Sequence, residues 1–317
     1  MSRPGRQPRK PSYLQFYPTL RCNFSCPFCF NRGLPGMADT DPAAFEKMVA
    51  AAKGEGIGHI DFLGGEPTLH PEIETLVGMI QTAGMMTTMS SNGTRPETLE
   101  RLSRAFPENA LRIGVSVNSA PIGKPLLDYI HAHRPIIKRL YADDCENAEA
   151  DLFFGIDGDY PDLRLIYRDA VSVPDLAACA DFNRFHTALA RMSPRFPGLK
   201  GVYCSGFLPD PDHPVLEEVR CPAGTTKLAV TPGGDVYPCY LLFRYAHFKL
   251  GNLLKDGFSS ILAHPALDYF RVFEKNRCPQ TECGRFEQCH GGCPAVAYIF
   301  TGDLAGPDPR CCGTRNF

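Results

Sequence analysis

The sequence has no long apolar run, no large net charge and no export signal. Nowhere in its 317 residues is there an uninterrupted apolar stretch of about eighteen residues, the length that a membrane span needs. Residues 1–11 are basic and contain prolines but no apolar core, so we expect a disordered tail rather than a signal peptide. The formal net charge of −2 gives no reason to expect nucleic acid as a partner. These absences predict a cytoplasmic protein without a membrane anchor.

The rest of the composition is that of a globular protein with a sizeable core. Hydrophobic residues make up 44% of the chain and charged residues 21%. A chain of this length favours one large domain and a smaller one. Beyond Pro197 prolines and glycines become frequent and helical periodicity fades until 258–273. We therefore expect a first domain at 12–200 and a second at 201–317.

Fourteen cysteines are many for a chain that is not exported. In a reducing compartment, thiols at this density are better explained by metal binding than by disulfides. Three lie between 22 and 29, nine lie between 204 and 312, and only Cys145 and Cys179 lie in the middle. This distribution predicts two metal-binding regions separated by a cysteine-poor scaffold. Cys145 and Cys179 are either inert buried thiols or, at the rim of a site, hydrogen donors.

The first three cysteines form the pattern CxxxCxxC directly after a strand-like run. Cys22, Cys26 and Cys29 follow the segment 12–20, and a loop that leaves a strand can fold three sulfurs around one inorganic cluster. A [4Fe–4S] cluster held by three thiolates keeps one iron open for a ligand that is not protein. A zinc site is the alternative, and it would want a fourth Cys or His at short range. The nearest downstream histidine is His59.

Strand and helix patterns alternate from residue 12 to about 170, which implies parallel strands with crossover helices in an open or closed α/β barrel. Strands are expected at 12–20, 59–63, 86–90, 111–117, 136–141 and 163–167. Helices are expected at 42–54, 71–83, 96–106, 125–133 and 181–192. The loops that follow parallel strands collect on one face of such a barrel, where function lies.

Two motifs together resemble the radical S-adenosylmethionine (SAM) superfamily: CxxxCxxC with aromatic Phe28 before its last cysteine, and Gly64-Gly65-Glu66-Pro67 at the end of the second strand. The resemblance implies a partial barrel of six β/α units. It also implies that the open iron binds the amino and carboxylate groups of SAM and supplies the electron that releases a 5′-deoxyadenosyl radical. Two glycines would let the backbone approach the SAM ammonium, and the Glu66 carboxylate would pair with it.

Polar residues at the ends of later strands are candidates for further SAM contacts. Ser90, Asn92, Ser116 and Asn118 are expected either to bond the ribose or adenine or to serve only as turn formers. Arg168 follows the sixth strand, where it would contact the SAM carboxylate or form a surface ion pair.

The C-terminal cysteines resemble the SPASM extension of radical SAM enzymes, which holds two auxiliary iron–sulfur clusters. By this resemblance the first cluster is bound by Cys221, Cys239 and Cys293, and the second by Cys278, Cys283, Cys289 and Cys311. Four residues separate Cys278 from Cys283 where two are usual, and Cys312 is a possible substitute for Cys311. The first cluster needs Cys204 as fourth ligand or leaves an iron open for substrate. A pair of structural zinc sites is the alternative.

A hairpin is expected at 231–237, turning at Gly233-Gly234 and bringing Cys221 and Cys239 together. Tyr240 stands where sulfatase maturases of the SPASM group place an Asp base. Tyr240 is expected to be a packed aromatic or a proton relay.

The resemblance implies an oxidative enzyme acting on a peptide or small protein, reduced by a partner such as flavodoxin or ferredoxin. Only 21 residues precede Cys22, which predicts that a separate protein recognises any leader peptide. The alternative is a small-molecule dehydrogenase, epimerase or decarboxylase with a sugar, aminocyclitol or tetrapyrrole substrate. A non-catalytic iron–sulfur scaffold would leave the open iron and Glu66 without use.

Overall fold

A computed structural model of the chain describes residues 11–119, 121–142, 153, 155–156, 159–179, 182–202, 221–271, 278–279, 282 and 291–311. Within these ranges, no helix has both the length and the apolar character to cross a membrane.

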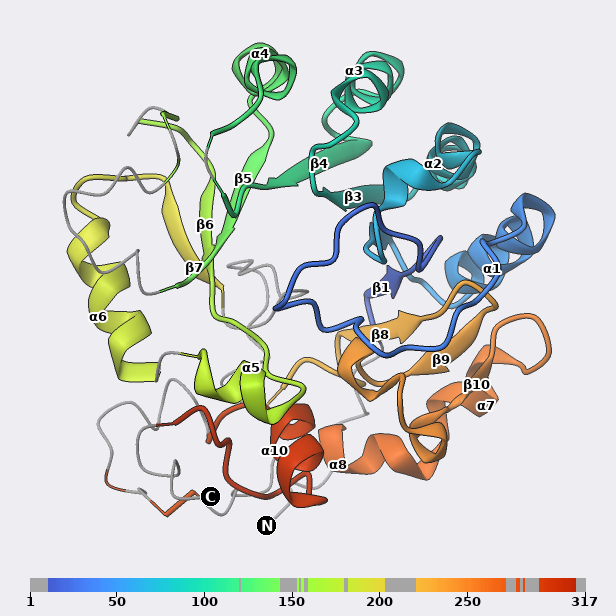
Figure 1. The fold of residues 1–317 in the computed structure, drawn as a ribbon. Coiled ribbons are helices and arrows are strands. Elements are labelled where there is room, and N and C mark those ends of the chain that lie inside the picture. Colours follow the sequence, from blue (N-terminus) through green and yellow to red (C-terminus); the bar gives the residue numbers. More distant parts are fainter. Residues whose placement is uncertain are drawn as a thin grey trace.

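Ten strands form one sheet, and helices cover the outer side of its parallel part (Figure 1). The strands are β1 Tyr13–Phe16, β2 His59–Phe62, β3 Met86–Ser91, β4 Leu111–Ser116, β5 Ile136–Leu140, β6 Leu163–Ile166, β7 Leu199–Val202, β8 Lys227–Val230, β9 Asp235–Tyr237 and β10 Gly251–Asn252. The helices are α1 Pro42–Gly54, α2 Ile73–Thr82, α3 Pro96–Ala105, α4 Lys124–His133, α5 Val173–Ala177, α6 Phe182–Met192, α7 Phe258–Leu262, α8 Asp268–Arg271 and α10 Pro294–Thr301. Short 3₁₀ turns are η1 Pro67–Leu69, η4 Tyr240–Leu242, η5 Ala246–Phe248 and η6 Pro265–Leu267.

The sheet order is β10-β9-β8-β1-β2-β3-β4-β5-β6-β7, and all neighbours from β1 to β7 run parallel. Each crossover returns the chain to the same end of the sheet, so the carboxyl ends of β1 to β6 share one rim. This arrangement confirms the α/β barrel class. All six predicted strands and all five predicted helices of the first region are present, with shifts of a few residues at their ends.

Local chemistry explains how α1 begins. The Asp41 side chain accepts a hydrogen bond of 2.9 Å from the Ala44 amide, and Pro42 occupies the first turn, where a missing N–H costs nothing. Phe45, Met48 and Val49 then face the sheet on the buried side of the helix.

Two predicted elements are shorter than expected because prolines interrupt them. The first strand ends at Phe16 rather than residue 20, since Pro18 has no backbone donor for the ladder. The helical stretch predicted from Phe258 stops at Leu262, and Pro265 opens a separate 3₁₀ turn before α8. A seventh parallel strand, β7, was not predicted, and it spans the expected boundary at residue 200.

The C-terminal region continues the barrel sheet. Strands β8 and β9 form the predicted hairpin, and β8 pairs parallel with β1, residue Tyr13 opposite Lys227. The larger apolar core lies between the parallel strands and helices α1 to α4 and α6. A second core packs Tyr17, Tyr240 and Phe243 with Val296 of α10. The cysteine-rich region is therefore fixed against the start of the barrel.

Candidate active site

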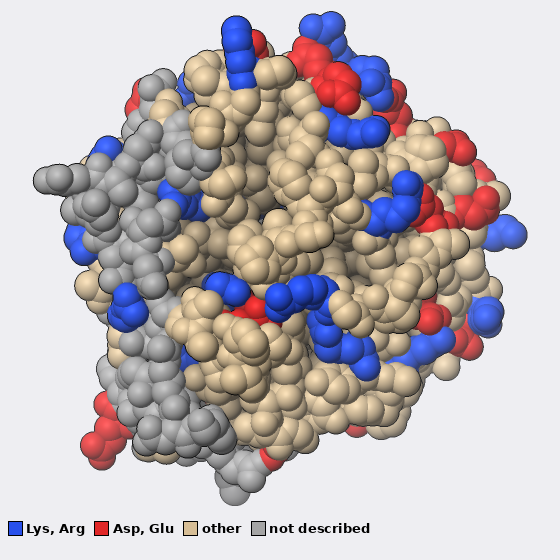
Figure 2. All heavy atoms as spheres, in the orientation of Figure 1, with Lys and Arg blue, Asp and Glu red and all other residues tan. Residues whose placement is uncertain are grey.

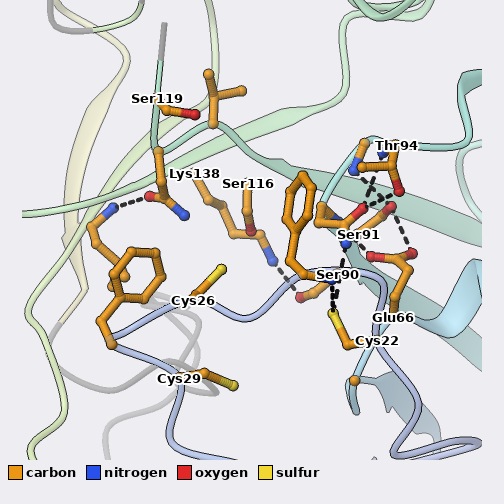
Figure 3. Close-up of a pocket in the computed structure, with 18 of the residues that line it drawn as sticks. Cys22, Cys26, Cys29, Glu66, Ser90, Ser91, Thr94, Ser116, Ser119 and Lys138 are labelled. Carbon is orange, nitrogen blue, oxygen red and sulfur yellow. Dashed lines mark hydrogen bonds between the residues drawn. The ribbon is translucent and has the colours of Figure 1, made fainter.

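A cavity of about 780 Å³ opens at the carboxyl ends of the parallel strands. Its wall includes Cys22, Cys26 and Cys29 from the loop after β1, which we call the cluster loop (residues 21–34). The loop after β2 and the ends of β3 and β4 complete one side. Figure 3 shows the three cysteine side chains extending from the cluster loop beside Glu66 and Ser90. The fold thus brings the two sequence motifs to one site.

The three thiols of the cluster loop influence one another. Burial raises the pKa of Cys26, and the nearby charges of Cys29 and Cys22 raise it further. Burial likewise raises the pKa of Cys29, and Cys22 again adds to the shift. Sulfur of Cys22 accepts hydrogen bonds from the Phe24 amide at 3.4 Å and from Nδ2 of Asn92 at 3.8 Å. Clustered sulfurs with N–H donors around them fit the thiolate ligands of an iron–sulfur cluster.

No three His, Cys, Asp or Glu side chains within the described ranges are arranged to hold a single metal ion. His59, the nearest histidine in sequence, begins β2 at the opposite end of the strand from the cavity, and its Nε2 lies 2.9 Å from the Thr88 hydroxyl. It is therefore not placed to complete a zinc site with the cluster loop.

Ion pairs and side-chain hydrogen bonds hold the cluster loop in place. Arg32 bonds both carboxylate oxygens of Asp175, at 2.8 and 2.9 Å. The Arg244 guanidinium donates to the carbonyls of Phe30 and Arg32. The side-chain Nδ2 of Asn31 donates to the Gly64 carbonyl at 2.7 Å. Partners from α5, from the C-terminal region and from the glycine turn therefore fix this loop together.

Gly64 and Gly65 are required because the backbone of another segment lies against them. A Cβ on Gly64 would lie 2.4 Å from the Thr19 carbonyl oxygen, and φ is +127° there. A Cβ on Gly65 would lie 2.1 Å from the Arg21 carbonyl oxygen. The Gly65 and Glu66 amides donate to the Thr19 and Arg21 carbonyls at 3.0 and 2.8 Å. Because neither glycine has a Cβ, the segment after β2 can pack closely against the start of the cluster loop.

The Glu66 side chain is only 1% exposed and accepts four hydrogen bonds from the protein. Oε1 accepts from the Thr68 amide at 3.1 Å, the Thr68 hydroxyl at 2.7 Å and the Ser91 hydroxyl at 2.9 Å. Oε2 accepts from the Asn92 amide at 2.6 Å. Oε2 can accept a further hydrogen bond from a ligand, and the expected pairing of Glu66 with the SAM ammonium stays a prediction. The sequence did not indicate that Glu66 also holds Thr68, Ser91 and Asn92 in place.

The four polar strand-end candidates all line the cavity but differ in their bonding. Ser90 accepts from the ammonium group of Lys138. Asn92 accepts from the Thr94 amide at 3.0 Å in an Asx turn, and Asn118 accepts from the Leu140 amide at 2.9 Å. Ser116 makes no side-chain hydrogen bond to the described residues, so its hydroxyl is open to a ligand.

Arg168 lies on the cavity wall with its charge already matched. Its guanidinium is 3.3 Å from Asp175 and 5.8 Å from the centre of the Phe28 ring. Of the two roles expected for Arg168, the structure shows an ion pair, one that is largely buried.

Two ionisable residues of the cavity wall were not singled out from the sequence. Lys138 reaches the cavity from β5 and Asp169 from the segment after β6. The Tyr240 hydroxyl donates to Asp169 at 2.6 Å, and both side chains are buried. Tyr240 is packed as expected, at 4.6 Å between ring centres from Phe30. The available signal for Lys138 was a charged residue inside the strand expected at 136–141.

Among the C-terminal cysteines that the structure describes, two are buried (Cys239 and Cys278) and three are partly buried (Cys221, Cys293 and Cys311). Burial raises the pKa of Cys293. Cys221 and Cys293 both pack against the second core. Cys221 and Cys239 flank the hairpin at the same end, and the Ala223 amide donates to the Cys221 sulfur at 3.4 Å. Asp308 bonds to two of the candidates: its carboxylate accepts a hydrogen bond from the Cys293 amide at 2.8 Å, and its carbonyl accepts one from the Cys311 amide at 3.1 Å.

Several predicted residues lie outside the described ranges: Cys145, Cys204, Cys283, Cys289 and Cys312. The first ten residues of the expected tail also lie outside them. Cys278 is buried, and its role as a ligand stays a prediction. Cys179 is buried behind Arg168, whose carbonyl oxygen is 3.8 Å from the thiol, and burial raises its pKa to about 11.

Family profiles match two separate parts of the chain. The radical SAM superfamily profile matches residues 16–139, and the profile of the SPASM iron–sulfur cluster-binding domain matches residues 221–294. The chain belongs to the radical SAM superfamily. Within that superfamily it carries the SPASM domain, which makes it a radical SAM enzyme with an auxiliary iron–sulfur region. SAM, a radical SAM [4Fe–4S] cluster and auxiliary iron–sulfur are its cofactors.

Among curated proteins, the PqqA peptide cyclase of Streptomyces rochei is 26% identical over 324 residues, 92% of this chain and 87% of the relative. The mycofactocin maturase MftC of Mycobacterium tuberculosis is 39% identical over 98 residues, 29% of this chain and 23% of the relative. Streptococcus suis SuiB bound to precursor peptide SuiA matches with a TM-score of 0.73 at 16% identity, over 96% of this chain and 76% of SuiB. Native anSMEcpe with bound AdoMet matches with a TM-score of 0.68 at 17% identity, over 96% of this chain and 95% of that chain. These two likenesses show the fold.

Proposed function

We propose that this enzyme oxidatively modifies a peptide, abstracting a hydrogen atom from one of its carbons. The observation that carries the proposal is that Cys22, Cys26 and Cys29 share one large cavity with the Gly-Gly-Glu turn and with the hydroxyls of Ser90 and Ser116. A site of this size accommodates a nucleoside cofactor together with part of a second molecule.

The residues of this site fit SAM and its cluster. When bound, the cluster supplies the electron that cleaves SAM to the 5′-deoxyadenosyl radical. Cys22, Cys26 and Cys29 would hold the cluster, and Oε2 of Glu66 would accept a hydrogen bond from the methionyl ammonium. Ser116 and Ser90 would face the ribose side. Enclosure by the barrel would exclude water from the reacting carbon.

A peptide is favoured as substrate by the apolar character of the outer wall. Phe24 lines the cavity and is 51% exposed, so its ring is accessible to a ligand at the mouth of the cavity. Opposite elements contribute Pro121, Ile122 and Leu126 to the same cavity. An apolar mouth suits a ligand that continues beyond the cavity. Similarity to PqqA peptide cyclases over 92% of the chain supports the same substrate class.

Asp169 is suited to accept a proton from the substrate. It is the carboxylate that reaches the cavity beside Arg168, and it is held in place by the Tyr240 hydroxyl at 2.6 Å and by Arg310 at 3.6 Å. In a net oxidation Asp169 would accept the proton that the substrate releases, and the auxiliary iron–sulfur region, when loaded, would supply the electron acceptor. A base in contact with substrate contributes about 10²–10⁴-fold.

The auxiliary region is proposed to hold two clusters, with Cys221, Cys239 and Cys293 at the first and Cys278, Cys283, Cys289 and Cys311 at the second. Cys204 would supply the first cluster's fourth ligand. A flavodoxin or ferredoxin is the proposed reductant.

The test is an anaerobic assay of reconstituted protein with dithionite, SAM and a panel of peptides. The panel contains the PqqA peptide, SuiA and any short peptides encoded beside this gene. We expect one peptide to accelerate 5′-deoxyadenosine release and to lose two hydrogen atoms by mass. Cys26→Ala should abolish both. Cys179→Ala, a buried cysteine outside the cavity wall, is the matched control and should retain both.

Other outcomes separate the alternatives. If a sugar or aminocyclitol is consumed while every peptide is unchanged, the enzyme acts on small molecules. If Cys179→Ala stops turnover but spares SAM cleavage, a thiol hydrogen donor and an epimerase follow. For Asp169→Asn, SAM cleavage should persist while oxidised peptide falls at least about 100-fold. Unchanged peptide oxidation in this variant would exclude Asp169 as the base.

A further inference from the structure

The Asn92 side chain is held in one orientation by its neighbours. Its Oδ1 accepts hydrogen bonds from the Thr94 amide at 3.0 Å and from the Thr94 hydroxyl at 2.7 Å. A backbone amide can only donate, so this contact identifies the oxygen end of the Asn92 amide group. Its nitrogen, Nδ2, lies on the side of the cluster loop, where it donates to Oδ1 of Asn23 at 2.9 Å.

The second N–H of Nδ2 reaches a thiol of the CxxxCxxC motif. Nδ2 lies 3.8 Å from the Cys22 sulfur, within the range of a hydrogen bond to sulfur (Figure 3). No other side chain of the described residues hydrogen-bonds to Cys22, Cys26 or Cys29, whose remaining donors are backbone amides. Both N–H groups of Nδ2 and both acceptor positions of Oδ1 are thus used within the protein, which leaves none of them for a nucleoside.

The backbone that carries Asn92 is also fixed. The Asn92 amide donates to Oε2 of Glu66 at 2.6 Å, and the Gly93 amide donates to the Ser91 hydroxyl at 3.0 Å. The φ angle of Gly93 is +74°, and a Cβ there would lie 2.6 Å from Leu126. The protein itself therefore holds Nδ2 in place, so little conformational entropy is lost when it bonds the sulfur.

A hydrogen bond to a cluster sulfur favours the reduced cluster. One electron added to a [4Fe–4S] cluster increases the negative charge on its sulfurs, and an N–H donor stabilises that charge. Hydrogen bonds to the sulfurs are accordingly among the factors that set the reduction potential of such a cluster. Because Cys22 receives this bond from a side chain, a substitution can remove it.

Charged groups act on the same potential but respond differently to salt. On the face shown in Figure 2, most charged groups lie around the edge, and a group of basic side chains with one acidic group among them lies near the centre. Salt screens exposed charges, whereas close contacts away from solvent are screened much less. Ionic strength therefore separates the two contributions.

We propose that the hydrogen bond from Nδ2 of Asn92 to the Cys22 sulfur raises the reduction potential of the N-terminal [4Fe–4S] cluster. Asn92 is then a positioning residue that acts through Cys22, in place of the ribose or adenine contact expected from the sequence. This inference rests on the proposed binding of that cluster by Cys22, Cys26 and Cys29.

An anaerobic redox titration of the reconstituted protein without SAM, followed by electron paramagnetic resonance, provides the test. Dithionite supplies the electron, and the signal that Cys26→Ala lacks identifies the N-terminal cluster. A net hydrogen bond corresponds to about a 5-fold change in an equilibrium constant. Asn92→Ser should therefore lower the potential by about 40 mV, at about 59 mV per tenfold change, in low and in high salt. The serine hydroxyl keeps an acceptor for the Thr94 amide but is too short to reach Cys22.

Asn31→Ser is the matched control. Nδ2 of Asn31 donates to the Gly64 carbonyl at 2.7 Å, so this variant also loses a side-chain bond that holds the cluster loop, but none to a sulfur. Its potential should equal that of the wild-type protein. Asn92→Asp guards against a folding defect in Asn92→Ser. It keeps the shape of the side chain, loses the N–H donors and adds a negative charge, so its potential should fall further.

Iron content and equilibrium binding of SAM are measured on the same preparations. Asn92→Ser should load as much iron as the wild-type protein, and its SAM affinity should change by less than about 3-fold.

Four results would overturn the proposal. An unchanged potential in Asn92→Ser would exclude the bond as a determinant. An equal fall in Asn31→Ser would assign the effect to the position of the loop, and a fall that disappears at high salt would assign it to surface charge. Weaker SAM binding with an unchanged potential would return Asn92 to the ribose or adenine. A wild-type chain that loads no N-terminal cluster would instead contradict the proposed function itself.

Discussion

Replacing Gly65 with alanine should separate the glycine turn from the cluster loop. The added Cβ would lie 2.1 Å from the Arg21 carbonyl oxygen and 2.6 Å from that of Leu20. An ordinary contact begins at 3.4 Å, so the two backbones must move apart by about 1.3 Å. That movement breaks the hydrogen bonds that the Gly65 and Glu66 amides donate to Thr19 and Arg21.

The cost follows from these contacts. Two buried backbone hydrogen bonds at about 1 kcal/mol each and about 1–3 kcal/mol of overpacking give a loss of about 3–5 kcal/mol. Urea denaturation of reduced apoprotein measures the free energy of unfolding, and iron analysis after reconstitution measures cluster retention. Gly36→Ala is the control, because a Cβ there meets nothing within 4 Å. A Gly65→Ala protein with wild-type stability, iron content and 5′-deoxyadenosine release would refute this explanation of the motif.

Three further predictions concern the rest of the site. Iron should approach about twelve atoms per reconstituted chain if three [4Fe–4S] clusters form, and about four would contradict the C-terminal assignment. Tyr240→Phe should lower the free energy of unfolding by about 1–3 kcal/mol by leaving Asp169 short of a donor, whereas Tyr245→Phe, whose hydroxyl bonds no described residue, should change it little. Because folding lowers the pKa of Lys138 from 10.5 to about 8, the unfolded chain binds more protons between these values, and this residue makes stability rise with pH by up to about 3 kcal/mol. The wild-type minus Lys138→Met difference in unfolding free energy should therefore grow between neutral pH and about pH 10, and a constant difference would contradict the buried, perturbed amine.

Much of the fold could be predicted because its signals are local. Asp41 and Pro42 mark the start of α1, and the strand patterns of β2 to β6 alternate with helical patterns as βα units require. The position of the two motifs on one rim could be predicted from the topology, because parallel strands end at the same edge of the sheet. β7 was not predicted because Leu199–Val202 is short and contains a glycine and an exposed lysine.

The rest of the site depends on contacts between distant parts of the chain. The bond between Tyr240 and Asp169 joins residues 71 positions apart. The path of Lys138 to Ser90 depends on an absent side chain at Gly114, which only the strand register reveals. The pairing of β8 with β1 brings the C-terminal cysteines to the barrel, and no local sequence pattern predicts which strand β8 pairs with.

The central claim is that Cys22, Cys26 and Cys29 hold a cluster with an iron open to SAM. Anaerobic electron paramagnetic resonance of the dithionite-reduced protein, recorded before and after SAM is added, tests it most directly. We predict that SAM shifts the signal of the N-terminal cluster and that Cys26→Ala loses this shift while keeping the signals of the C-terminal region. A cluster spectrum unchanged by SAM would contradict the account.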